Sequence, residues 1–206
     1  PDGRYLAVGG FPNSSGYELK IYSFDGSSLT PLIFKNFGSD VNLRLRAVTW
    51  SPDGKYLSIG GAFLSSGEEL EIHRFNGSSL TLVASTDSQL GTNQVFSTSW
   101  SPDGRYIAVG EYYYAGGTKL RIYSFNESSL SLAAETGDFY NINSLDWSQD
   151  GRYLAIVSSE SSEDFLKIYY FNGSSLSLIA SQSYEYAANS VNWSPDNRYV
   201  AICGYS

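Results

Sequence analysis

The chain repeats one motif four times, and this internal repeat constrains its fold more than any other feature. Its four tryptophans, Trp50, Trp100, Trp147 and Trp193, follow one another at intervals of 50, 47 and 46 residues. Ser-Pro-Asp-Gly follows the first two, Ser-Gln-Asp-Gly the third and Ser-Pro-Asp-Asn the fourth. The sequence opens inside the same string, at 1–3, so we expect it to be cut from a longer periodic pattern or to begin out of phase.

The first half of each unit predicts two strands joined by a tight turn. Apolar residues alternate over 47–50, which is typical of a strand that we name the inner strand. Pro, Asp and Gly at 52–54 favour a turn with Gly in the left-handed conformation. Asn197 replaces this Gly in the last copy, and Asn is the residue other than Gly that best tolerates a positive φ. A second strand is predicted over 56–60, followed by a loop of eight or nine residues.

The second half of each unit predicts a hairpin. Apolar and charged residues alternate over 19–24, 120–125 and 166–171, which favours a third strand. Asn-Gly-Ser-Ser at 76–79 is a strong hairpin signal. A fourth, outer strand follows, as at 80–85. Because the strands alternate in direction, both kinds of turn are predicted on one rim, the lower rim, and the longer loops on the opposite upper rim.

Four antiparallel strands repeating every 46 to 51 residues fit a propeller blade. An immunoglobulin-like sandwich has no such self-similarity, and the two-residue period excludes helical solenoids. We therefore predict an all-β fold, a β-propeller built of four-stranded antiparallel blades with about four blades per chain. As one segment covering 1–206, it divides into repeat units 1–51, 52–101, 102–148, 149–194 and a partial unit 195–206.

At this point the strings resemble those of the WD-repeat β-propellers and their bacterial TolB-type relatives. The resemblance lies in Trp-Ser-Pro-Asp-Gly at 50–54, Tyr-Leu-Ala-Val-Gly at 5–9 and Leu-Lys-Ile-Tyr at 19–22, and through their copies it spans the whole chain. The chain lacks the Trp-Asp that commonly ends the third strand in that family and the Gly-His that precedes its inner strand. We therefore expect a divergent lineage whose repeats were duplicated recently.

The predicted strands number 17, whereas a closed four-bladed ring needs 16. An inner strand at 190–193 could complete the opening blade, leaving the strand at 199–203 surplus or displacing its counterpart at 5–9. Incomplete blades expose apolar faces and edges that favour association. Two hypotheses stay open: two chains form an eight-bladed ring, or the chain is a segment of a longer propeller.

Charge and composition exclude several partner classes. With 13 Lys plus Arg against 21 Asp plus Glu, the net charge of −8 opposes phosphate contacts, so we expect no nucleic-acid partner. No apolar run approaches the roughly 18 residues that span a bilayer, so we expect no membrane association. Cys203 and His73 are the single Cys and His, too few for an internal disulfide or a conventional zinc site. We expect no cofactor and no metal.

An enzymatic function is disfavoured by the same residues. Cys203 occupies the position of a strand Gly in other units, and His73 that of a strand tyrosine, so both are interpreted as structural. The repeated acids of the lower-rim turns are interpreted as turn formers, and these are Asp53, Asp103 and Asp150. No nucleophile elbow, phosphate loop or His-Glu-x-x-His helix occurs. The chain is therefore predicted not to be an enzyme.

The compartment is only weakly indicated. Five Asn-x-Ser sequons are compatible with secretion. Three of them are explained by the hairpin turn and a fourth lies in a predicted strand, which leaves a cytoplasmic location favoured and secretion as the alternative. The sequons are Asn13, Asn76, Asn126, Asn172 and Asn192.

The units differ most in the upper-rim loops, and variable loops on a rigid scaffold are where binding usually resides. These loops combine aromatic and acidic residues, the former typical of recognition surfaces. We predict that they bind a protein or peptide, possibly a basic one; the alternative is a self-assembling structural module, a homodimer. The candidate residues are Phe11, Phe63, Glu68, Glu69, Glu111, Tyr112, Tyr113, Tyr114, Phe139, Tyr140, Glu160, Tyr184 and Tyr186.

Overall fold

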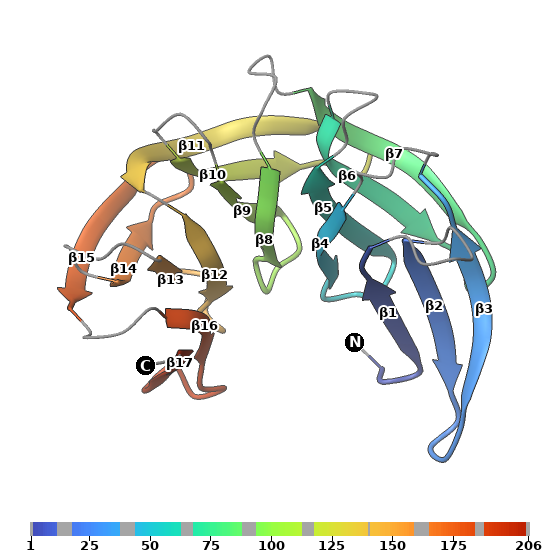
Figure 1. Ribbon diagram of the computed structural model, residues 1–206. Helices are drawn as coiled ribbons and strands as arrows, with labels where there is room; N and C mark the ends of the chain where they lie inside the picture. The colour runs from blue at the N-terminus through green and yellow to red at the C-terminus, as the bar shows by residue number, and fades with distance from the viewer. Residues whose placement is uncertain are drawn as a thin grey trace.

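The computed structural model describes nine stretches of the chain and contains, within them, seventeen strands and no helix (Figure 1). The strands form five antiparallel sheets. The described residues are 2–11, 18–37, 44–62, 68–87, 94–112, 118–139, 141–158, 165–183 and 188–204.

Three of the sheets are complete four-stranded blades, each a meander from inner to outer strand. Blade 2 consists of β4 (Arg44–Trp50), β5 (Tyr56–Ala62), β6 (Glu68–Phe75) and β7 (Leu80–Asp87). Blade 3 consists of β8 (Gln94–Trp100), β9 (Tyr106–Tyr112), β10 (Thr118–Phe125) and β11 (Leu130–Phe139). Blade 4 consists of β12 (Ile142–Trp147), β13 (Tyr153–Ser158), β14 (Leu166–Phe171) and β15 (Leu176–Gln182).

The two remaining sheets are incomplete blades. Within the described residues, blade 1 has three strands and no inner strand; it consists of β1 (Tyr5–Gly9), β2 (Leu19–Phe24) and β3 (Leu29–Lys35). In the same part of the chain, blade 5 has the inner and second strands, β16 (Ala188–Trp193) and β17 (Val200–Gly204).

The blades stand side by side in an open arc, with β4, β8, β12 and β16 along its inside and β3, β7, β11 and β15 along its outside (Figure 1). This arrangement confirms the predicted propeller of four-stranded antiparallel blades. β16 pairs with β17, and within the described stretches it does not pair with β1. The ring of four blades is therefore not closed within the chain.

The lower-rim turns form as predicted. Gly54 has φ 72° and its N–H donates to the Ser51 carbonyl at 2.9 Å, and Asn197 takes the same conformation with φ 60°. The Asp53 carboxylate accepts from the Lys55 N–H at 3.0 Å and from Ser51 Oγ at 2.6 Å. These bonds recur at the other repeats, so the repeated Asp residues hold the turns.

Close approach between successive blades explains the glycine near the end of the second strand. A Cβ at Gly60 would lie 2.3 Å from Val95 Cγ1, and a Cβ at Gly110 would lie 2.5 Å from Ile142 Cγ2. In blade 4 the equivalent residue is Val157, and the facing residue of the next inner strand is the small Ala188. At this interface the larger residue lies on the second strand and the smaller one on the next inner strand, the reverse of the other two interfaces. The total side-chain volume between the strands is thereby conserved.

Candidate functional site

Each inner strand carries a β-bulge near the upper rim, four residues before its tryptophan. In β4, Leu45 pairs with Gly61 and Ala47 with Gly60, so the residue between them has no paired neighbour. The same register shift occurs in β8, β12 and β16. Bulges re-aim a side chain and are frequent beside functional sites. The four residues at these bulges are Arg46, Phe96, Asn143 and Asn189.

The bulge is a consequence of the apolar pattern. Ile142 and Leu145 are three residues apart, yet both lie in the cluster between blades 3 and 4. A regular strand would send them to opposite faces, because its side-chain period is two. The extra residue of the bulge brings Ile142 and Leu145 to the same face of the strand and leaves Asn143 outside this core.

Two arginines of β4 each lie over an aromatic ring of a neighbouring blade. The Arg46 guanidinium carbon lies 4.1 Å from the centroid of the Phe96 ring, which lies 5.1 Å from the Tyr112 ring at a tilt of 35°. On the other side of β4, the Arg44 guanidinium lies 5.1 Å from the Phe11 ring. We name these five residues the aromatic–arginine surface. Arg44, Arg46 and Phe11 are exposed, and Phe96 and Tyr112 are half-buried.

An ion-pair network joins strands β9, β10 and β11 of blade 3. The Arg121 guanidinium binds the carboxylates of Glu111 and Glu135, and Lys119 Nζ lies 2.8 Å from Glu135 Oε1. Burial disfavours the charged form of Arg121, but the two carboxylates outweigh it and the pKa of Arg121 is raised. The hydrogen bond from Lys119, with help from Arg121, lowers the pKa of Glu135. Both acids are therefore bound to cationic side chains of the same blade.

The structure places the predicted binding residues in four groups, one of which is Glu68 and Glu69 at the start of β6. Phe11 and Tyr112 belong to the aromatic–arginine surface. Glu111 and Phe139 are only 2% and 4% exposed, so neither side chain forms part of the upper-rim surface. Phe63, Tyr113, Tyr114, Tyr140, Glu160, Tyr184 and Tyr186 lie outside the described residues.

The prediction of a loop is wrong for several of these positions. Three strands run further towards the upper rim than their apolar patterns indicated: β9 reaches Tyr112, β11 reaches Phe139, and β6 begins at Glu68. Glu68, Glu69 and Glu111 are thus strand residues. Cross-strand hydrogen bonding to a neighbouring strand extends the ladder beyond the point where apolar alternation stops.

Sequence reasoning missed Arg44, Arg46 and Phe96. The signal was present in the spacing, since apolar residues stand five and two residues before Trp50, Trp147 and Trp193, an odd interval that a regular strand cannot place on one face. When the repeats are aligned on their tryptophans, the position four residues before each tryptophan lies between the two apolar positions and varies among Arg, Phe and Asn.

The one histidine is a core residue, as predicted. His73 pairs with Leu57 in the register in which Tyr169 pairs with Leu154, which confirms that it fills a tyrosine position. It is 1% exposed, and its Nε2 lies 2.6 Å from Glu71 Oε2. The Phe37 ring meets it edge-on at 6.0 Å. Cys203 pairs with Ser190 as Gly110 pairs with Ser97, which confirms its predicted position.

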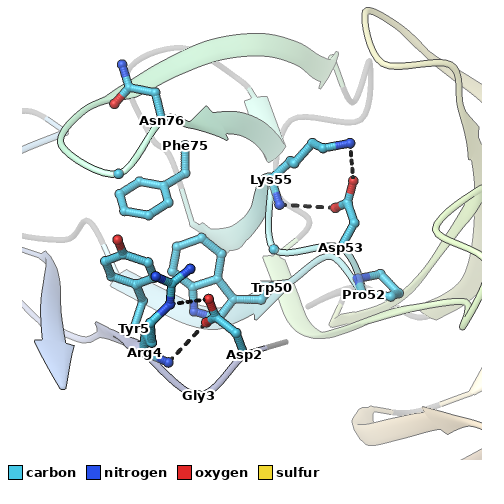
Figure 2. Close-up of a pocket in the computed structure, with 12 residues that line it drawn as sticks. Asp2, Gly3, Arg4, Tyr5, Trp50, Pro52, Asp53, Lys55, Phe75 and Asn76 are labelled. Atoms are coloured by element: carbon cyan, nitrogen blue, oxygen red, sulfur yellow. Dashed lines mark hydrogen bonds and ion pairs between the residues drawn. The ribbon is translucent and has the colours of Figure 1, made fainter. Parts of the chain in front are cut away.

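A pocket of about 560 Å³ opens on the lower rim between blades 1 and 2 (Figure 2). Its apolar wall consists of Tyr5, Trp50 and Phe75, whose rings pack edge to face. Two ion pairs border it: Arg4 with Asp2 at 2.5 Å and Lys55 with Asp53 at 3.1 Å. Exposure of all four charged residues leaves these pairs weak.

An equivalent pocket of about 430 Å³ lies between blades 2 and 3. It has the corresponding turn residues and Tyr56 and Phe125 in its wall, but no tryptophan. Trp100 is buried there, because the inner strand of blade 2 covers it. Trp50 lines the first pocket since blade 1 has no inner strand.

The described stretches lack two features that would point to other functions. They contain no group of three or more His, Cys, Asp or Glu side chains that could hold a metal ion. They also contain no helix long and apolar enough to cross a membrane.

The sequence matches the family described as the ELP1 first N-terminal beta-propeller over residues 73–205, more than half of the chain. No curated protein matches it. A solved structure of a protein from Bacteroides uniformis, described as a 6-phosphogluconolactonase, superposes with a TM-score of 0.75 at 15% identity, over 98% of this chain and 61% of the other.

Two further structures have the same fold. The Cps50 (Swd1) β-propeller domain of Myceliophteria thermophila gives a TM-score of 0.73 at 16% identity, over 98% of this chain and 62% of that domain. Hydrazine synthase of Kuenenia stuttgartiensis gives 0.66 at 14% identity, over 92% and 50%. The chain thus spans less than two thirds of each solved structure, and at these identities the likeness shows the fold alone.

Proposed function

This chain belongs to the ELP1 first N-terminal β-propeller family, a WD-repeat-like propeller family, and on that premise we propose that it is a non-catalytic scaffold that binds a protein or peptide at its upper rim. Propellers of this kind are typical interaction scaffolds. The proposal goes further by assigning binding to the aromatic–arginine surface and the adjoining upper-rim loops.

The observation that carries the proposal is the stack of Arg46 on Phe96, continued by Tyr112. Arg and aromatic residues dominate the binding energy of protein interfaces, because they offer large contact area with a polar end. Here they project from adjacent inner strands of two blades, so the scaffold holds them in fixed relative positions. Preorganised side chains lose little conformational entropy on binding.

Charge favours a basic partner. The net charge of −8 attracts cations over distances beyond direct contact and raises the rate of encounter. Glu111 and Glu135 are bound to Arg121 and Lys119, so the proposed attraction comes from the summed field of the chain rather than from these two carboxylates. Close contact is assigned to the rings of Phe11, Phe96 and Tyr112.

A displayed library of random 12-residue peptides, panned against the immobilised chain, tests this proposal. We expect enriched peptides to combine Lys or Arg with an aromatic or apolar residue, and their affinity to fall at least tenfold with Phe96→Ala or Arg46→Ala. Arg105→Ala is the matched control, because Arg105 lies over the Tyr106 ring on the lower rim. Equal losses in all three variants, or no enrichment, would overturn the assignment.

The non-catalytic part is supported by the position of His73. This imidazole is enclosed between blades 1 and 2 and hydrogen-bonded to Glu71, where no substrate would meet it without opening the interface. A panel of ester, lactone and phosphate-ester substrates tests this part. Turnover that disappears in a folded His73→Phe variant would contradict it.

Self-association into an eight-bladed ring is a second candidate, and one observation favours it. Leu6, Val8 and Phe24, on the face of blade 1 that is turned away from blade 2, are 41–46% exposed. Their counterparts in blade 2, Leu57, Ile59 and Phe75, are at most 8% exposed. Contiguous exposed apolar side chains mark interaction surfaces. Light scattering at micromolar concentration should give the mass of two chains, and a single-chain mass would reject this candidate.

A further inference from the structure

We propose that the lower-rim pocket between blades 2 and 3 binds a guanidinium group, and that this group is the arginine side chain of a polypeptide partner. The site is separate from the upper-rim surface and lies between two complete blades. Three observations support it: a glutamate in a turn that elsewhere carries glycine, a buried tyrosine hydroxyl without a partner, and an apolar wall beside both.

The first observation is the residue at the tip of the hairpin turn in blade 3. The other three hairpin turns carry glycine at this position, with a φ of 98° at Gly26 and Gly173 and of 96° at Gly77. Glu127 stands there in blade 3, with φ 72°. Residues with a side chain seldom adopt this conformation, and those that do cluster at functional sites. Of the four turns, only the one beside this pocket projects a carboxylate from its tip.

The pocket contains one carboxylate that is not bound by the chain itself. It has a volume of about 430 Å³, and its acidic residues are Asp53, Asp103 and Glu127. Asp53 Oδ2 lies 3.1 Å from Lys55 Nζ, and Asp103 Oδ2 lies 3.9 Å from Arg105 Nε. Within the described residues, Glu127 forms neither an ion pair nor a hydrogen bond. A cation that enters the pocket therefore meets a free carboxylate.

Lys55 is nearby, but its ammonium is bound to a different acid. The hydrogen bond with Asp53 is the main reason that the pKa of Lys55 is raised, and attraction by Glu127 contributes less. Because Lys55 and Glu127 are both exposed, solvent and salt screen this attraction. Lys55 therefore leaves Glu127 available to a second cation.

The second observation is the hydroxyl of Tyr56, a residue that lines the same pocket. Tyr56 is only 7% exposed, and its hydroxyl forms no hydrogen bond in the part of the chain that the structure describes. Burial raises the pKa of Tyr56, and the charge of Glu127 adds to this effect. The phenol is therefore neutral at neutral pH, and its oxygen can accept a hydrogen bond. Buried polar groups normally have such a partner.

The repeats show that these two groups are neighbours. At the interface of blades 3 and 4, a Cβ at Gly173 would lie 3.7 Å from the hydroxyl oxygen of Tyr106. Glu127 and Tyr56 hold the same two positions at the interface of blades 2 and 3. The Glu127 side chain therefore begins beside the Tyr56 hydroxyl, and one ligand can contact both.

The third observation is the apolar wall of the pocket, which contains Pro52, Pro102 and Phe125. The Phe125 ring lies 5.0 Å from the Tyr56 ring. Pro52 lies against the next turn, with 3.8 Å between its Cδ and the place of a Cβ at Gly104. The packing of one turn on the next forms the wall before any ligand binds, so little conformational entropy is lost on binding.

An arginine side chain matches these features better than a lysine or a small cation. Its planar head can donate two parallel N–H bonds to the carboxylate of Glu127 and a third bond to the hydroxyl of Tyr56. A lysine ammonium is a compact, strongly hydrated charge and lacks this planar geometry. The methylene stem of arginine covers apolar surface while its head stays on polar partners. A small guanidinium compound would leave the apolar wall uncovered.

Titration of the chain with N-acetyl-arginine amide, followed by NMR of the backbone amides, tests this proposal. We expect saturable shifts at Glu127 and Tyr56. The dissociation constant should rise about tenfold or more in Glu127→Gln, since a charge-assisted hydrogen bond is lost. Glu127→Gly should give the same loss and restores the glycine of the other turns, so it separates the carboxylate from backbone strain. Absence of saturable shifts at these residues would overturn the proposal.

Glu135→Gln is the matched control, because it also removes one negative charge from blade 3 but at an acid bound to Lys119 and Arg121. It should leave the dissociation constant unchanged. Equal losses in Glu127→Gln and Glu135→Gln would assign binding to the net charge of −8 and overturn the site.

Three further ligands test the chemical class. N-acetyl-citrulline amide has the shape of the arginine ligand without its charge, and N-acetyl-lysine amide has a charge without the planar head; both should bind more weakly. Binding of either as tight as that of the arginine ligand would overturn the assignment to a guanidinium group. Methylguanidinium should also bind more weakly, and equal or tighter binding would overturn the assignment to a polypeptide side chain.

Tyr56→Phe tests the hydroxyl, because it removes only that group from the pocket. The dissociation constant of the arginine ligand should rise about threefold or more, the usual effect of losing one hydrogen bond. Tyr106→Phe is the control, since it removes the corresponding hydroxyl at the next interface and should not change binding. An unchanged dissociation constant in Tyr56→Phe would contradict the role of this hydroxyl.

Discussion

The ring of Tyr56 meets the ring of Phe125 edge-on, with 5.0 Å between centroids and 79° between planes. Tyr5 with Phe75 and Tyr106 with Phe171 repeat this relationship at 4.9 Å and 77° and at 5.0 Å and 80°. In each pair the tyrosine belongs to the second strand of one blade and the phenylalanine to the third strand of the next. The same tyrosine–phenylalanine contact therefore joins blades 1 and 2, blades 2 and 3, and blades 3 and 4.

Phe125→Ala should destabilise the chain by about 3–5 kcal/mol, the usual effect of removing a buried phenylalanine. The loss includes the contacts with both Tyr56 and Trp100. Phe24→Ala is the matched change at the uncovered end, and it should have a much smaller effect on the unfolding of a single chain. Urea denaturation followed by tryptophan fluorescence measures both. Similar losses of unfolding free energy in the two variants would show that Phe125 does not stabilise the chain through its contact with the neighbouring blade.

The facing pair Gly110 and Ile142 predicts a compensating double substitution. Gly110→Val alone should destabilise by about 1–3 kcal/mol or more, because its side chain would overlap that of Ile142. Adding Ile142→Ala should recover much of that loss, since the pair then copies Val157 and Ala188 of the next interface. A double-mutant cycle from urea unfolding measures the coupling. Additive losses would show that the two interfaces are not interchangeable.

The fold could be predicted from the sequence, but the candidate site only in part. Turn chemistry and alternation are local, so Asp53, Gly54 and the strand at 56–60 could be read from one repeat. The strand ends could not, because the ladder at Glu111 and Tyr112 continues by pairing with neighbours. Burial of Glu111 depends on its bond to Arg121, which is ten residues away in sequence and on another strand.

The missed surface has a different origin. Arg46 stands one residue before the inner strand predicted over 47–50, and Phe96 is its counterpart in the next unit, but both lie within the longer observed strands β4 and β8. The bulge that changes their direction comes from the requirement to bury Leu45 and Val48, or their equivalents, on the same face. Only the contacts between two packed blades show which residues on each side of the bulge face the core.

Glu111→Gln should destabilise the chain by about 3 kcal/mol, in the range found for breaking buried ion pairs. Arg121 is nearly buried and would keep only the carboxylate of Glu135. Glu135→Gln is the control, because Glu135 is half-exposed and solvent screens its charge, so its effect should stay below about 1 kcal/mol. Thermal and urea unfolding at low and high salt compare them. Comparable losses in the two variants would contradict the importance of burial at Glu111.

Asp146→Asn should stabilise the chain at neutral pH. Burial raises the pKa of Asp146 above its ordinary value of 3.8, although its carboxylate accepts a hydrogen bond from the Trp193 N–H at 2.8 Å. Because the folded pKa exceeds the unfolded one, the favourable contribution of this group is complete below about pH 3.8 and is lost as the pH rises through the folded pKa. Asparagine keeps an acceptor for Trp193 without a charge. Its advantage in urea unfolding should therefore be larger at pH 7 than at pH 4, whereas an asparagine variant that is less stable at pH 7 would show that the charged hydrogen bond outweighs the burial of the carboxylate.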